Sequence, residues 1–168
     1  QGFRLATAFL SAVYHPGTAD TGEDLRVGTS NNRPMFSVQP STAVLVGGKL
    51  RITAPYRFAF ARDCLPNVHG AKDILSALGG GTTLYNDLPA LVSCTGARNV
   101  ATLSFAEDLD VAIRYTFRVG VSNPLLPHPA DWPFPQNIWR FETFDPVGAP
   151  LNAAQAEAFY LWAFANAY

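Results

Sequence analysis

The sequence predicts an all-β domain in which two antiparallel sheets pack face to face as a β-sandwich, with one short helix near residues 71–78. Polar and apolar residues alternate in several short segments, and residues 113–119 show the pattern most clearly. Strands of this kind bury one face and leave the other in water. The 13 glycines and 13 prolines separate these segments as turn signals. A length of 168 residues, 48% of them hydrophobic, is sufficient for one core.

Nine segments carry the strand pattern, in order 3–13, 35–38, 43–46, 49–53, 58–61, 90–94, 101–105, 113–119 and 139–142. The alternation divides their side chains into two sets. The inward set, which should fill the space between the sheets, is Leu50, Ile52, Leu103, Ile113, Tyr115, Phe117, Val119, Trp139 and Phe141. The outward set is Lys49, Arg51, Arg114, Arg118 and Arg140, and a shift of one residue in register would exchange the two sets.

Three segments depart from the strand pattern. Residues 71–78 space their apolar side chains for a helix, and Gly79 follows as a stop signal. Residues 123–136 contain five prolines, so we expect an extended loop there, with a linker between domains as the alternative. Residues 152–168 fit either a helix capped by Asn152 or a strand from Phe159, and the aromatic residues lead us to predict the strand.

The two cysteines, Cys64 and Cys94, each close a segment that resembles the end of a strand. An even count in a domain that we expect to be secreted favours a disulfide between them. Two reduced, buried thiols are the alternative. Two cysteines by themselves supply too few ligands for a structural metal site.

Composition narrows the classes of partner. Charged residues make up only 15% of the chain, which suits a surface partly covered by neighbours. A net charge of −1 argues against nucleic acid, because a polyanion calls for a basic face. No apolar run approaches the ~20 residues that span a bilayer. The chain begins with Gln1 rather than Met, and we interpret this start as that of a processed, extracellular product or a fragment.

No cluster of residues identifies a reaction. The histidines, His15, His69 and His128, lie beside Pro or Gly and away from any catalytic spacing with Ser, Cys or an acid. Gly79 to Gly81 lack the ending of a phosphate-binding loop. We therefore predict a protein that is not an enzyme and that uses no cofactor.

Two weaker candidates for ligand binding remain. Asp20, Glu23 and Asp24 lie in one turn-rich loop and could supply oxygen ligands to calcium, although solvated carboxylates explain them better. Trp132 lies in the proline-rich segment, where an exposed indole could stack on a sugar ring. Cell-surface or matrix glycans are therefore the alternative class of partner.

The two ends of the chain resemble each other. With one single-residue gap, the start aligns with the end at an offset of about one domain, as expected of tandem repeats, with chance similarity as the alternative. We therefore predict a sandwich domain over residues 1–150 and a C-terminal segment, 151–168, whose strand reaches or begins the next unit. The predicted assembly interface comprises Phe3, Leu5, Phe9, Phe159, Leu161, Trp162 and Phe164.

Two segments of the sequence resemble a known kind of module. The first comprises residues 47–55 with Phe58, Phe60 and Cys64, and the second comprises residues 115–124 followed by 137–142. Together they resemble a module repeated in very large secreted or surface proteins of protists, dinoflagellates and their relatives especially. The resemblance covers residues 35–145. It implies immunoglobulin-like sandwich repeats with a structural or adhesive role, and it brings no catalytic residue.

These observations lead to one functional expectation. We predict a non-catalytic extracellular module that assembles head-to-tail with copies of itself or with adjacent repeats. A carbohydrate-binding module that uses exposed aromatic residues is the alternative.

Overall fold

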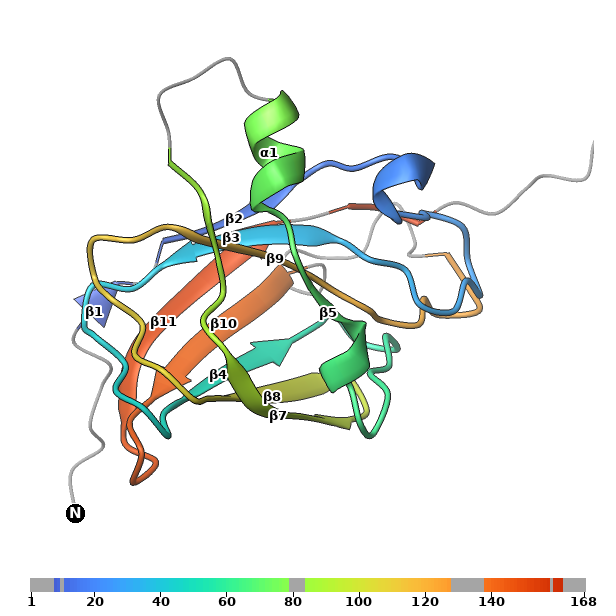
Figure 1. Ribbon diagram of the computed structural model, residues 1–168. Coiled ribbons are helices and arrows are strands. Elements are labelled where there is room, and N and C mark those ends of the chain that lie inside the picture. The colour runs from blue at the N-terminus through green and yellow to red at the C-terminus, as the bar shows by residue number, and fades with distance from the viewer. Residues whose placement is uncertain (1–7, 10, 79–83, 128–137, 158, 162–168) are drawn as a thin grey trace, which may run out of the picture.

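Two β-sheets packed face to face form most of the structure (Figure 1). This computed structural model describes residues 8–9, 11–78, 84–127, 138–157 and 159–161. Almost all neighbouring strands are antiparallel, which confirms the predicted all-β sandwich with one short helix.

The first sheet has six strands in the order β1-β11-β10-β4-β8-β7. Their bounds are β1 Ala8–Phe9, β11 Pro150–Glu157, β10 Ile138–Phe144, β4 Lys49–Thr53, β8 Val100–Phe105 and β7 Leu91–Ala97. The pairing of β1 with β11 is parallel, and the other pairs in this sheet are antiparallel.

The second sheet has five strands, with β2-β3-β9-β5 in order and β6 beside β9. Their bounds are β2 Ser11–His15, β3 Met35–Gln39, β9 Tyr115–Val119, β5 Val68–Gly70 and β6 Asn86–Asp87. Two short 3₁₀ turns, η1 Ala19–Thr21 and η2 Leu65–Asn67, lie in the connections. Helix α1, Lys72–Leu78, lies on the outer face of this sheet beside β3 and β9 (Figure 1).

The predicted alternation holds in the core. Of the nine residues predicted to face inward, eight are buried, and only Ile113 is half-buried because β9 begins after it, at Tyr115. Phe36 of β3 joins the two sheets, since its ring lies 4.9 Å from Trp139 and 5.1 Å from Phe141 between ring centroids. On the outward faces, Lys49 and Arg140 are exposed, whereas Arg51, Arg114 and Arg118 are half-buried.

Two predicted strands are reduced to single bridges. Within 43–46 only Val44 pairs, with Leu109, and within 58–61 only Ala59 pairs, with Ser122. Both segments lie where the chain turns at an end of the sandwich, as the turn closed by the amide of Gly48 on Leu45 illustrates at 2.8 Å. A turn removes the extended backbone that longer pairing needs.

The predicted C-terminal strand is displaced toward the N-terminus. The strand that forms is β11, which ends at Glu157 and pairs along its length with β10, so the sandwich extends past residue 150. Residues 159–161 form no strand. At the other end, the predicted strand over 3–13 corresponds to β1 and β2, which belong to different sheets.

The predicted helix is confirmed as α1. Ala71 and Leu75 pack on Met35 of β3, with Ile74 and Tyr85 at the margin of this small cluster. The carboxylate of Asp87 accepts hydrogen bonds from the amides of Ala71 and Lys72 at 2.9 and 3.0 Å. No helix within the described ranges is long and apolar enough to cross a membrane.

Candidate functional site

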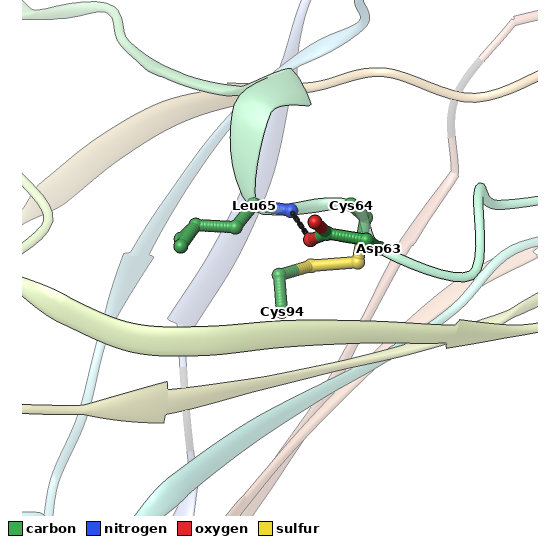
Figure 2. The surroundings of a disulfide bond; sticks show 4 residues. All are labelled: Asp63, Cys64, Leu65 and Cys94. Carbon is green, nitrogen blue, oxygen red and sulfur yellow. Dashed lines mark hydrogen bonds between the residues drawn. A yellow bond between two sulfur atoms is a disulfide. The ribbon is translucent and has the colours of Figure 1, made fainter.

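The cysteines form the predicted disulfide (Figure 2). Their Cα atoms lie 5.0 Å apart, and the amide of Cys64 donates to the carbonyl of Cys94 at 3.1 Å. Beside the bridge, the amide of Leu65 donates to Asp63 at 3.2 Å. Asp63 pairs with Thr95 in an isolated bridge, so the segment before Cys64 covers the outer edge of β7. An edge covered in this way is less open to strand addition.

The carboxylates of Glu23 and Asp24, two of the three calcium candidates, bind protein groups. Glu23 is buried, and its carboxylate accepts hydrogen bonds from the Tyr14 hydroxyl and from the amide of Gly17. Burial raises the pKa of Glu23 above its ordinary value. The guanidinium of Arg26 binds Asp24 and lowers the pKa of Asp24 to about 2. Within the described ranges, no group of three or more His, Cys, Asp or Glu residues, Asp20 included, could hold a metal ion.

The histidines do not form a triad among the described residues. The Nε2 atom of His15 lies 2.8 Å from the hydroxyl of Ser37, but Ser37 is buried in β3 and no carboxylate among the described residues hydrogen-bonds to the imidazole. His69 lies on β5 and pairs in register with Arg118. His128 and Trp132 lie outside the described residues, so the expected absence of a triad at His128 and the stacking role of Trp132 stay predictions.

The assembly residues predicted from the terminal similarity are only partly described. Phe9 lies in β1, while Phe3, Leu5, Trp162 and Phe164 lie outside the described residues. Phe159 and Leu161 were expected to be exposed on an unpaired strand, and this prediction is wrong. Both are buried in the core of their own sandwich, where the Phe159 ring lies 5.4 Å from Tyr14 and 6.1 Å from Trp139.

Of the 13 large apolar residues that are exposed in the described part of the chain, eight lie at the two ends of the sandwich. We define the first end by three loops: 40–48 after β3, 106–114 after β8 and 145–149 after β10. The amide of Val46 donates to Asp108 at 2.6 Å, and the side chain of Gln39, at the end of β3, donates to the carbonyl of Val111 at 3.4 Å, so the first two loops are joined. The third loop lies beside the first, because a Cβ atom at Gly47 would lie 3.6 Å from the Cβ atom of Pro146. The exposed large apolar residues at this end are Leu45, Val46, Val111 and Val147, and Glu107, Asp108 and Asp110 are exposed beside them.

The second end comprises the loops at the opposite ends of the same strands. Residues 54–60 follow β4, residues 120–127 follow β9, residues 22–34 precede β3, and residues 159–161 follow β11. The bridge between Ala59 and Ser122 joins two of these loops, and the amide of Gly28 donates to the carbonyl of Pro124 at 2.8 Å. The exposed large apolar residues at this end are Tyr56, Leu125, Leu126 and Tyr160.

The broad face of the six-stranded sheet has a different character. Cys94 and Leu103 point into the core, so their neighbours in β7 and β8 point outward, and these are Ser93, Thr95, Thr102 and Ser104. Farther across the same face, Arg51 forms an ion pair with Glu142 at 2.8 Å. Polar groups on this face remain hydrated, whereas exposed aliphatic groups at the ends favour contact with another apolar surface.

No protein family, curated protein or solved structure matches this chain. The resemblance to protist repeat modules therefore stays a prediction. Sequence reasoning missed the two apolar ends, because Leu45, Val147 and Leu125 lie far apart in the chain and each is unremarkable in its own loop. The sequence contained one usable signal, since all three lie in or beside turn sequences where a large aliphatic residue is uncommon.

Proposed function

We propose that this chain is a non-catalytic extracellular module that assembles head-to-tail with copies of itself, the first end of one unit contacting the second end of the next. The observation that carries the proposal is the placement of exposed aliphatic side chains at both ends. Val147 is 89% exposed at the first end and Leu125 is 82% exposed at the second. Burying such groups against each other contributes roughly 25 cal/mol per Å² of apolar surface removed from water.

The path of the chain favours a linear order of units. Ala8 pairs with Asn152 near the start of β11, on the side of the first end. Leu161 follows the far end of β11, on the side of the second end. The described chain therefore enters at one end of the sandwich and leaves at the other. A head-to-tail contact is heterologous, and repeating it without closure produces a filament.

The disulfide supports the extracellular part of the proposal. Disulfides persist in oxidising compartments and are rare where glutathione keeps thiols reduced. The bridge also fixes the loop that covers β7, so strand addition at that edge is blocked in part and association through the ends is favoured.

Two paired substitutions test the proposal in the full chain. The first-end variant carries Leu45→Ser and Val147→Ser, and the second-end variant carries Leu125→Ser and Leu126→Ser. We expect the unmodified chain to associate progressively with concentration in sedimentation velocity. Each variant should weaken association by more than about tenfold, because each lacks one half of every contact. Leu78→Ser is the control, since Leu78 is 67% exposed at the end of α1 and lies in none of the loops that form the two ends.

A mixture of the two variants gives the sharpest outcome. The first-end variant keeps an intact second end, and the second-end variant keeps an intact first end. Mixing them should therefore yield a one-to-one dimer that does not grow further. An unmodified chain that stays monomeric, or variants whose mixture stays monomeric while the unmodified chain associates, would contradict the head-to-tail contact.

A further inference from the structure

A group of cationic side chains lies on the outer face of the five-stranded sheet. Arg118 of β9 pairs in register with Met35 on one side and with His69 of β5 on the other. Arg33 lies two residues before β3 and packs over the turn at Gly22, where a Cβ atom would lie 3.1 Å from the Cδ atom of Arg33. All three basic side chains are half-buried.

Two nitrogen atoms of this group are buried without a hydrogen-bond partner in the described part of the chain. They are Nε of Arg118 and Nε2 of His69. The Nη1 atom of Arg118 does have a partner, because it donates to the carbonyl of Thr21 at 2.8 Å. Native proteins pair nearly all buried polar atoms with protein groups, water or an ion. The Nε–H group of Arg118 is always a donor, and Nε2 of His69 is a donor in the tautomer that carries its proton there, so the two nitrogens on adjacent strands point to an absent acceptor.

The charges point to an acceptor that is negative. The positive charge of Arg33 lowers the pKa of both His69 and Arg118, after the larger effect of burial, so the like charges act on one another. Across the described ranges, no carboxylate lies within ion-pair distance of Arg33 or Arg118. Asp87 is the acid whose charge acts on Arg118, but its Oδ1 atom already accepts from two amides at the start of α1.

We propose that Arg33, Arg118 and His69 form a binding site for a tetrahedral oxyanion, sulfate or phosphate. The anion supplies acceptors to the orphaned nitrogens and offsets the repulsion between the two guanidinium groups. Water could satisfy the nitrogens, but it would leave Arg33 and Arg118 without an ion pair in the described part of the chain. Arginine suits this role, because its planar, permanently charged guanidinium offers several donors to oxyanions. Arg33 lies in the loop 22–34 that borders the second end, but the site uses none of the exposed apolar residues there, and so its failure would leave the proposed assembly intact.

Titration of the full chain with sodium sulfate, with sodium chloride at equal ionic strength as the reference, tests the site. We expect saturable shifts in the NMR amide signals of Arg33, His69 and Arg118. Arg118→Gln and Arg33→Gln should each weaken binding by about tenfold or more, as expected for charge-assisted hydrogen bonds. Arg140→Gln is the matched control, because Arg140 is exposed on the other sheet. Arg118→Lys, which keeps the charge without Nε, should fall between Arg118→Gln and the unmodified chain.

Unfolding by urea provides a second readout, useful because Arg118→Gln also loses the bond to Thr21. Without sulfate, Arg33→Gln should be at least as stable as the unmodified chain, since it removes the like charge. With saturating sulfate the unmodified chain should become more stable than Arg33→Gln, because only the unmodified chain gains stability from a fully bound anion. Absence of saturable shifts with sulfate and with phosphate, or equal sulfate affinity in Arg33→Gln and the unmodified chain, would overturn the site.

The same oxyanion can be free in solution or attached to a polysaccharide. A sulfated oligosaccharide at the same concentration of sulfate groups distinguishes the two sources. Tighter binding of the oligosaccharide, lost in Arg33→Gln, would identify a sulfated glycan as the source. Equal binding of the two probes would identify the free ion. Either result supports the site.

Discussion

Asn32 and Asn123, 91 residues apart in the chain, are joined by a hydrogen bond of 3.0 Å between their buried side chains. The same two residues hold the neighbouring loop. Asn32 accepts from the amide of Asp24 at 2.7 Å, and Asn123 donates to the carbonyls of Asp24 and Arg26 at 2.7 and 2.8 Å. This network connects the loops that form the second end of the sandwich, and so it positions the loop that carries Leu125 and Leu126.

Replacing Asn123 should therefore destabilise the fold. Asn123→Ala leaves the Asn32 amide and two backbone carbonyls unsatisfied, at a cost of about 1–3 kcal/mol for each group that stays buried. Urea unfolding measures the loss, with Ser30→Ala as the control for an exposed residue of the same loop. In a double-mutant cycle, the effects of Asn123→Ala and Asn32→Ala should not add. Additive effects would mean that the two side chains act independently.

Removing the disulfide should lower the free energy of unfolding without changing the fold. For the double substitution Cys64→Ala and Cys94→Ala we expect a loss of about 2–5 kcal/mol, because the bridge restricts the unfolded chain. Chemical denaturation measures this loss. Dithiothreitol should reproduce the loss in the unmodified chain and have no effect on the double variant. Equal stability of the two proteins would show that the segment before Cys64 is held by its backbone pairing with β7 alone.

Phe159 and Tyr160 should behave differently although they are adjacent. Phe159 is 5% exposed and packs on Tyr14, Phe58 and Trp139, so Phe159→Ala should cost about 3–5 kcal/mol of stability. Tyr160 is 56% exposed, and Tyr160→Ala should change stability little. Thermal or urea unfolding compares the two. If Phe159→Ala instead abolished association at unchanged stability, the residue would belong to an interface rather than to the core.

The buried carboxylate of Glu23 should make stability depend on pH. Burial raises the pKa of Glu23 above its ordinary value of 4.5, while hydrogen bonds from Tyr14 and Gly17 oppose the shift in part. The folded protein therefore binds this proton more tightly than the unfolded chain does. The stability that this proton contributes is fully present below pH 4.5 and is lost as the pH rises through the raised pKa.

Comparison with Glu23→Gln isolates this contribution. The free energy of unfolding of the unmodified chain, relative to that of Glu23→Gln, should increase as the pH falls from 7 toward the ordinary value of 4.5. Urea unfolding over that range measures the difference. Glu107→Gln, at an exposed position, controls for the change in net charge. A constant difference between the unmodified chain and Glu23→Gln would show that Glu23 has the same proton affinity in both states.

The sequence by itself determined the local features of this protein. Alternation in 49–53, 101–105 and 139–142 placed Leu50, Leu103 and Phe141 in the core, because successive side chains of a strand point to opposite faces whatever the strand pairs with. Helical spacing before Gly79 located α1. The even count of cysteines predicted the disulfide, although Cys94 lies within β7 and Cys64 directly before η2 rather than each at the end of a strand.

The tertiary structure decided what depends on the path of the chain. Phe159 and Leu161 are residue types that are common in strands, yet β11 ends before them. Both side chains are buried in the core, where the ring of Phe159 packs against Trp139. The gathering of Leu45 with Val147, and of Arg33 with Arg118 and His69, follows from which strands pair and where their loops close. The periodicity of a sequence predicts the face of a strand on which a side chain lies. The neighbours of that side chain depend on which segments pair, and these segments are distant in the chain. No local sequence pattern encodes that pairing.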